Sequence, residues 1–431
     1  MKKRILLCLI FAAILLLSGC DLRTAGEMYA VPVRPAEDYN LQDAINKAMT
    51  GLDYSAPKSG TNQQIVQTAD LDGNGDMEYL LFAKGDSDRP LQIFIFDKQK
   101  QTYHLVDTIS CNGYAFDRIE YVQMDNRPGK EIVVGYQLND RMTGGLSVYA
   151  FNAGNMEQLL STTYSQFLIT DLNEDRYEEL FLIKHGPNEW GKGVAEIYSV
   201  NGREVERSVE LNLSVPVADV RRVILGKLQD GANCVYVSGK NGETALSTDV
   251  FTLLDDAFVN VSHMTANPTT VQTLGNYFVD SADIDGDGIL EIPMLLDMVQ
   301  VTQDGDSAHK IISWYSLDSQ GMPYGKIYTY HCFVDGWFVE LEPTWTQILT
   351  VSRQGKKVDF FSWDKHYGVP IRLFSIQVLT GQNREELADG AIRLHTTTSA
   401  VFIGELTSNG ERYGITEQSL KDSFYLIQQD S

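Results

Sequence analysis

The chain has 431 residues, of which 43% are hydrophobic and 22% charged, so it is long enough for two or three domains and apolar enough to bury a core. Its 35 Lys and Arg residues against 58 Asp and Glu residues give a net charge of −23. Proteins that track nucleic-acid phosphates use clustered positive charge, and we therefore expect no nucleic-acid partner.

Residues 1–19 have the pattern of a secretion signal. A basic start at residues 2–4 precedes an apolar run over 5–17, which is shorter than the roughly 20 residues of a membrane-spanning helix. The sequence Leu17-Ser18-Gly19-Cys20 resembles the bacterial lipobox, which implies cleavage before Cys20 and lipid on its thiol. We expect a mature protein anchored to the membrane through Cys20 and facing outside the cytoplasm. The alternative is an ordinary secretory signal whose cleavage site happens to contain a cysteine.

Residues 20–40 carry no clear periodicity and contain Pro32 and Pro35, which favours a tether after the lipidated cysteine. Residues 41–49 then predict one short amphipathic helix that leans against the following domain. Its apolar positions are three or four residues apart, at Leu41, Ala44, Ile45 and Ala48.

From about residue 60 to 325 one pattern recurs roughly every fifty residues: a β-type segment, an acidic or turn-rich loop, a short apolar strand and a hairpin. The five loops lie at 70–78, 124–131, 171–179, around 230–231, and 283–291. β-Propellers repeat four-stranded antiparallel blades at about this period. Residues 41–325 therefore predict a mainly β fold, the short helix followed by a propeller of about five four-stranded blades, with five to seven possible. The alternative is an open β-sandwich with fortuitous turns.

The repeat stops near residue 326. Four strand-like segments follow, and residues 383–388 and 417–422 have the composition of short helices. We predict a smaller α+β C-terminal domain over residues 326–431.

The first and fifth loops carry oxygen-bearing side chains at positions 1, 3, 5 and 9, with glycine at position 6. These side chains belong to Asp70, Asp72, Asn74 and Glu78, and to Asp283, Asp285, Asp287 and Glu291. Ca²⁺ prefers six to eight oxygen ligands, and the glycine permits the sharp turn that aims alternate residues at one centre. A peptide carbonyl at position 7, from Asp76 or Ile289, completes the predicted ligand set.

An EF-hand is excluded, because its bidentate Glu at position 12 would fall at Leu81 or Met294, inside an apolar strand. A ligand loop that enters a β-strand resembles the FG-GAP or VCBS repeats of integrin α-subunit propellers and their bacterial relatives. The resemblance covers roughly residues 60–325 and implies structural Ca²⁺ in these loops. The overall organisation and export signal also resemble lipoproteins of Gram-positive bacteria that bear such repeats.

The other loops depart from the pattern. The third keeps oxygen ligands at Asp171, Asn173, Asp175 and Glu179, but Arg176 replaces the turn glycine, so we treat it as a weaker site. In the second loop Arg127 and Pro128 replace a ligand and the glycine, so we expect no ion there, and the fourth has lost the acidic spacing. The alternative for all of them is a turn without metal, since Asp, Asn and Gly favour turns by themselves.

No catalytic motif of the H-E-x-x-H, G-x-S-x-G or phosphate-loop type is present, and we predict no enzyme. The expected function is a binding or scaffolding module for an extracellular protein or glycan. The alternative is a glycan-binding or glycan-processing lipoprotein, for which the stretch Asn188–Gly191 and the tryptophans are candidate sugar contacts. In a third reading, the C-terminal domain carries the function and the propeller is a spacer.

Three cysteines, Cys111, Cys234 and Cys332, are expected to be buried thiols, although one disulfide is possible.

Overall fold

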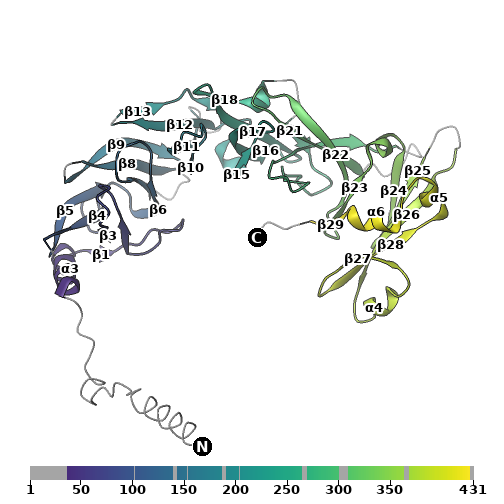
Figure 1. Ribbon diagram of the computed structural model, residues 1–431, viewed down its shortest axis with the longest axis horizontal. Coiled ribbons are helices and arrows are strands. Elements are labelled where there is room, and N and C mark those ends of the chain that lie inside the picture. The colour runs from purple at the N-terminus through teal and green to yellow at the C-terminus, as the bar shows by residue number, and fades with distance from the viewer. Residues whose placement is uncertain are drawn as a thin grey trace, which may run out of the picture.

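The computed structural model describes residues 36–427, except 101, 139–142, 153, 187–190, 203, 265–268, 300–308 and 364–367 (Figure 1). The predicted signal peptide, Cys20, residues 20–35 of the tether and positions 188–190 lie outside the described residues. Within them, no helix has the length and apolar character that crossing a bilayer requires.

The first described element is helix α3 (Ala36–Ala48), which begins inside the segment predicted as a tether. Ile45 on this helix is buried against Leu81, Phe94 and Phe96 of the first sheet. The apolar spacing over 41–48 marks the part of the helix that packs on the sheet. The preceding residues lack that spacing, which is why the sequence placed the helix start too late.

Four antiparallel sheets follow, each a meander of four main strands in chain order. The first contains β2 (Val66–Ala69), β3 (Glu78–Lys84), β4 (Leu91–Gln99) and β5 (Thr102–Cys111), with the short β1 (Asp53–Tyr54) also paired to β3. The second contains β6 (Ala115–Val122), β7 (Glu131–Gln137), β8 (Gly144–Asn152) and β9 (Asn155–Tyr164). The third contains β10 (Gln166–Thr170), β11 (Glu179–Lys184), β12 (Val194–Asn201) and β13 (Glu204–Arg207), with β14 (Leu211–Asn212) on β12. The fourth contains β15 (Val220–Lys227), β16 (Asn233–Lys240), β17 (Ala245–Leu254) and β18 (Ala257–Asn260), with β19 (Thr270–Gln272) on β17.

The fifth sheet departs from this plan at both ends. The strand predicted before its loop is reduced to two isolated bridges, Tyr277 with Leu274 and Ala282 with Glu291. The sheet then runs through β20 (Ile292–Asp297), β21 (Lys310–Leu317), β22 (Pro323–Cys332), β23 (Trp337–Leu341) and β29 (Phe424–Leu426). The boundary predicted between residues 325 and 326 falls inside β22, because the chain continues from β22 into β23 of the same sheet, to which β29 from the far end of the chain is added.

The sixth sheet lies in the C-terminal segment and has the order β24 (Leu349–Gln354), β25 (Lys357–Ser362), β26 (Ile371–Thr380), β28 (Ala400–Leu406) and β27 (Ile392–Thr396). Three short helices accompany it, α4 (Arg384–Leu387), α5 (Ser408–Arg412) and α6 (Glu417–Asp422). Thr416 caps α6, its side chain accepting the Ser419 N–H in a capping box, at the position where the sequence suggested a helix start. The mainly β fold, its successive four-stranded blades and the smaller α+β C-terminal part are therefore confirmed.

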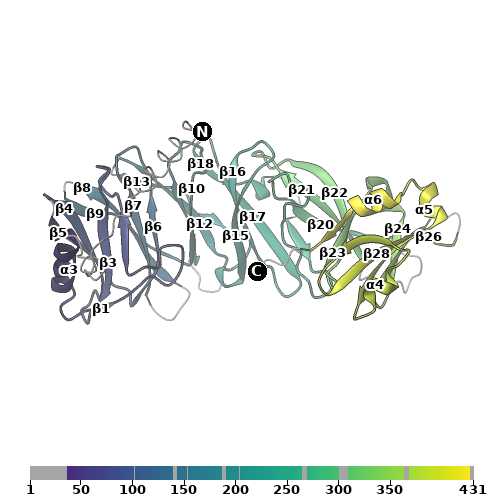
Figure 2. The ribbon, with the colours of Figure 1, turned by 60° about the horizontal axis from the view of Figure 1, so that its bottom comes forward.

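Each sheet packs face to face on the next, and each interface between two sheets has an apolar core of its own. Aromatic pairs mark these interfaces: Phe82 with Phe116, Tyr164 with Phe167, Phe181 with Phe251, and Tyr330 with Phe360. The sheets follow one another along an arc, and the first and sixth lie at opposite ends in both views (Figures 1 and 2). With these two sheets at opposite ends, the blades form an open array.

The cysteines and tryptophans of this array are mostly core residues. Cys111, Cys234 and Cys332 are buried free thiols, as expected from the sequence. Trp314 and Trp337 are also buried, which removes them as sugar-stacking candidates.

Candidate metal centres

The first loop gathers three carboxylates at the edge between β2 and β3. Oxygens of Asp70, Asp72 and Glu78 lie within 4.8 Å of one another. Backbone donors hold them there: the Gly73 and Gly75 N–H groups donate to the two Asp70 oxygens at 2.7 and 3.1 Å. Gly75, at the predicted turn position, has a φ of +89°, which a residue with a side chain adopts only with strain.

Glu78 gives this cluster its electrostatic character. The residue is fully buried, and its Oε2 accepts the Leu71 N–H at 2.7 Å while its Oε1 has no hydrogen-bond partner. Burial raises the pKa of Glu78 to about 7, and the neighbouring Asp72 and Asp70 carboxylates act in the same direction. A buried carboxylate oxygen without a partner is costly, and a cation between the three carboxylates would remove that cost. The donor set therefore fits a hard metal ion.

The fifth loop repeats this arrangement. Oxygens of Asp283, Asp285 and Glu291 lie within 4.8 Å of one another. The Ile284 N–H donates to Glu291 Oε2 at 3.0 Å, and burial raises the pKa of Glu291 to about 7. The Gly288 N–H donates to Asp283 at 3.0 Å, in the same way that Gly75 donates to Asp70.

The third loop, treated as the weaker site from its sequence, shares the geometry. Asp171, Asp175 and Glu179 form its cluster, and the Leu172 N–H donates to Glu179 Oε2 at 2.8 Å. Burial raises the pKa of Glu179 to about 7. Arg176 takes the left-handed conformation of the missing glycine, with a φ of +80°, and its N–H still donates to Asp171. The turn therefore survives the substitution at the expense of backbone strain.

The remaining predicted ligands shape the turns. Side-chain oxygens of Asn74, Asp287 and Asn173 accept the N–H of the residue two positions later, at 2.6, 2.7 and 3.0 Å. Asp76 and Ile289, predicted to offer carbonyl oxygens, are the donors in two of these bonds. Such Asx turns pre-form the loop before any ion is added.

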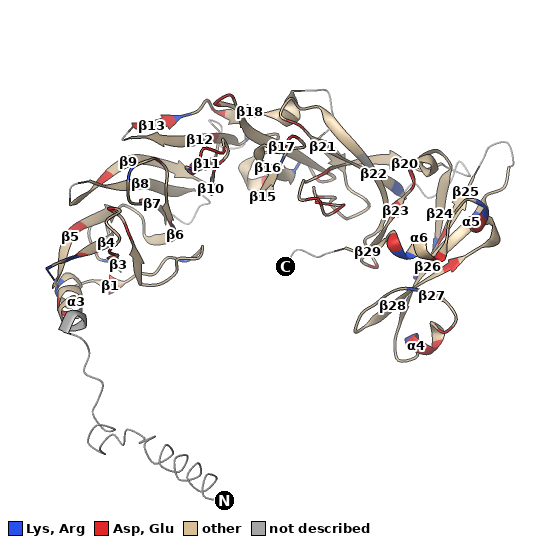
Figure 3. Cartoon of the chain, in the orientation of Figure 1, with Lys and Arg blue, Asp and Glu red and all other residues tan. Residues whose placement is uncertain are grey.

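The loops also connect neighbouring sheets, a role that sequence reasoning missed. A Cβ on Gly73 would lie 2.4 Å from the Gly129 nitrogen of the second loop. Two hydrogen bonds join the second and third loops: the Gln123 N–H donates to Glu178 Oε2 at 2.7 Å, and the Glu178 N–H donates to the Gln123 carbonyl at 2.9 Å. Asn233 Nδ2 donates to the Asp171 carbonyl, at 2.7 Å, which connects the third sheet to the fourth. Figure 3 shows Asp and Glu residues along the whole arc of sheets.

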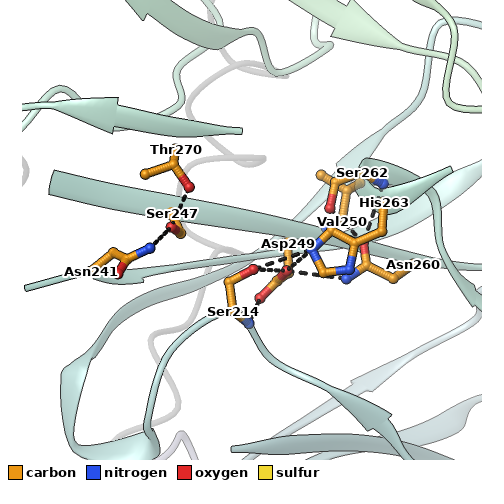
Figure 4. Close-up of polar contacts among 9 residues, drawn as sticks. All are labelled: Ser214, Asn241, Ser247, Asp249, Val250, Asn260, Ser262, His263 and Thr270. Atoms are coloured by element: carbon orange, nitrogen blue, oxygen red, sulfur yellow. Dashed lines mark hydrogen bonds and ion pairs between the residues drawn. The ribbon is translucent and has the colours of Figure 1, made fainter. Parts of the chain in front are cut away.

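A separate polar cluster surrounds the buried Asp249 of β17 (Figure 4). Its carboxylate accepts the Ser214 N–H and hydroxyl, both at 2.7 Å, and the Asn260 amide at 3.1 Å. His263 Nε2 lies 3.2 Å from both Asp249 Oδ1 and Ser214 Oγ. A serine–histidine–aspartate relay uses the two different imidazole nitrogens, whereas here one nitrogen contacts both partners. The cluster fastens the segment before β15 to the fourth sheet, and its only sequence signal was a charged residue inside an apolar strand.

Comparisons with known proteins find only distant structural similarities. No family model and no curated protein matches the chain. Among solved structures, a protein from Lactobacillus plantarum is 12% identical, with a TM-score of 0.25 over 75% of this chain and 94% of that one. The Bacillus licheniformis rhamnogalacturonan lyase PL11 is 11% identical, with a TM-score of 0.28 over 74% and 71%. TolB from Acinetobacter baumannii is 10% identical, with a TM-score of 0.23 over 77% and 67%. TM-scores this low establish no shared arrangement of the whole chain.

Proposed function

We propose that this protein is a lipid-anchored extracytoplasmic module of the FG-GAP or VCBS type, whose blades are stabilised by Ca²⁺ and which binds or scaffolds an extracellular partner. The observation that carries the proposal is the buried Glu78, which lies beside two further carboxylates and has one oxygen without a hydrogen-bond partner. The lipobox at residues 17–20 supports the anchor and the location.

Calcium suits these loops better than softer metals, because every candidate ligand is an oxygen. The ion would offset the repulsion among three carboxylates in each of the loops 70–78, 171–179 and 283–291. Each loop contacts the neighbouring sheet, the fifth through a hydrogen bond from the Tyr236 hydroxyl to the Leu290 carbonyl at 3.0 Å, so an ion there would stiffen a joint of the array. A stiff, exported array of sheets presents a constant surface to a partner.

Calorimetric titration of the EDTA-treated mature chain with Ca²⁺ tests the metal part of this proposal. We expect heat of binding and a rise in melting temperature, both reduced in Asp72→Ala and Asp285→Ala. Absence of heat and of any thermal shift in the wild type would show that the loops are turns without ions.

One observation favours the alternative, a glycan-binding function. A pocket of about 270 Å³ lies between the first strands of the second, third and fourth sheets, and its lining includes Asp117, Arg118, Tyr164, Gln166 and Phe167. Its lining combines aromatic groups with hydroxyl, amide and charged groups, and such polar groups orient small ligands in a pocket. Titration with cell-wall or plant oligosaccharides, compared between the wild type and Gln166→Ala, tests this function independently of Ca²⁺.

A further inference from the structure

The second loop, which lacks the ligand spacing, keeps two backbone hydrogen bonds of the acidic loops, although its left-handed residue, Gly129, comes one position later than Gly75 does in the first loop. The Met124 N–H donates to Glu131 Oε2 at 2.9 Å, across the same seven-residue separation as Leu71 and Glu78. The Arg127 N–H donates to Asp125 Oδ1 at 2.8 Å, as the Asn74 N–H donates to Asp72 in the first loop. Arg127 therefore occupies the structural position of Asn74.

The guanidinium of Arg127 lies among the carboxylates of its own loop. Its Nε is 2.7 Å from Asp125 Oδ2, and its Nη2 is 3.3 Å from Glu131 Oε1. Both carboxylates are buried, each 3% exposed. Glu131 Oε1 corresponds to Glu78 Oε1, the oxygen that has no partner in the first loop. The guanidinium thus contacts the oxygen equivalent to the one that is left for an ion in the first loop.

The second loop gains a positive charge at Arg127 and also has one carboxylate fewer than the first loop. Gln123 stands where the first loop has Asp70, and its Nε2 donates to the Asp125 and Arg127 carbonyls at 2.8 and 2.7 Å. Two carboxylates and one guanidinium leave the same net charge as three carboxylates and one divalent ion. Arginine is well suited to this place, because it stays charged and presents several donors in a fixed plane.

We propose that Arg127 is the built-in cation of the second loop and replaces a metal ion at the joint between the first two sheets. The inference rests on the proposed function for the statement that the other three loops take a divalent ion. It predicts that the wild type binds three Ca²⁺ ions and that the second loop holds its shape without one.

Two variants test the proposal in the mature chain. Arg127→Gln removes the charge, and we expect its melting temperature to fall by several degrees in EDTA and in Ca²⁺ alike, since two carboxylates alone hold an ion poorly. Lys130→Gln is the matched control, because it removes an exposed positive charge from the same loop and should shift the melting temperature little. Equal melting temperatures for these two variants in EDTA would overturn the proposal.

The triple variant Gln123→Asp, Arg127→Asn, Pro128→Gly gives the second loop the first loop's residues at these three positions. We expect a melting temperature below that of the wild type in EDTA, recovery in Ca²⁺, and a fourth bound ion by calorimetry. A folded triple variant that binds only as many ions as the wild type would contradict the proposal. If the triple variant does not fold, Arg127→Gln decides. A wild type that binds no Ca²⁺ would instead overturn the proposed function, and Arg127→Gln would still report whether the guanidinium holds the loop.

Discussion

A buried glutamate at the end of the loop, where the next strand begins, recurs in four loops of this protein. Glu78, Glu131, Glu179 and Glu291 are each at most 5% exposed, and each accepts the backbone N–H of the residue seven positions earlier. The sequence predicted three of these side chains as metal ligands. It could not show that one oxygen of each glutamate accepts a backbone N–H, because that depends on the strand pairing.

Replacing Glu78 with Gln separates the two roles of this side chain. The amide oxygen still accepts the Leu71 N–H, but the charge is gone, so at pH 8 in EDTA we expect stability equal to or above that of the wild type. With Ca²⁺ at about ten times its dissociation constant, a site adds about 1.4 kcal/mol, and the variant should lose this contribution. Melting curves with EDTA and with Ca²⁺ measure both effects. A Ca²⁺-induced rise as large as in the wild type would show that Glu78 is no ligand.

His263 provides a pH dependence that is separate from the metal loops. The hydrogen bond to Asp249 raises the pKa of His263, which burial opposes only in part. A histidine whose pKa is raised by folding stabilises the protein fully below its unfolded value, and this contribution is lost as the pH rises through the folded value. We expect His263→Gln to be less stable than the wild type at about pH 5.5 and nearly equal at about pH 9. Urea denaturation at both pH values measures this, and a difference that does not change with pH would contradict it.

At the scale of elements, the strands predicted from apolar runs are present with one exception, whereas a strand with a distant partner was missed. β29 pairs with β23, about eighty residues away in the chain, and no local pattern announces such a pairing. The segment before the fifth loop was predicted as a strand but forms only two isolated bridges, although its Val279 is buried with Ile312 and Trp314 as an apolar strand residue would be. The acidic loops were recognisable in the sequence, since their spacing is local. Their contacts with the neighbouring sheet were not.

Two glycines of the first loop allow a matched test of that contact. Gly73 and Gly75 have φ values of +73° and +89°, so alanine should cost each about 1–2 kcal/mol of strain. A Cβ at position 75 meets open space, but at position 73 it would collide with Pro128 and Gly129 of the second loop. We expect Gly73→Ala to cost about 1–3 kcal/mol more than Gly75→Ala in free energy of unfolding. Equal losses in urea denaturation would indicate that the two loops are not in contact.

At the scale of the whole molecule, helices cover both ends of the array. α3 packs on the first sheet through Ile45, and Ala388, which ends α4, packs against Leu379 and Val401 of the sixth. Terminal repeats of stacked arrays need such covers, because each has one face without a neighbouring repeat. The sequence predicted the first helix and its packing. It could not show whether the blades close into a ring, since closure depends on the rotation between sheets.

Covered ends and an open arc predict the shape of the protein in solution. A compact domain of the length described here would have a radius of gyration of about 21 Å, and an arc of six sheets should exceed that value clearly. Small-angle X-ray scattering of the mature chain measures this radius and the longest dimension. Because the ions are expected to stiffen joints that already exist, adding Ca²⁺ should leave the average shape nearly unchanged and slow protease cleavage between the sheets. A radius close to the compact value would mean that the first and sixth sheets meet, and the helices at the two ends would then lie inside an interface.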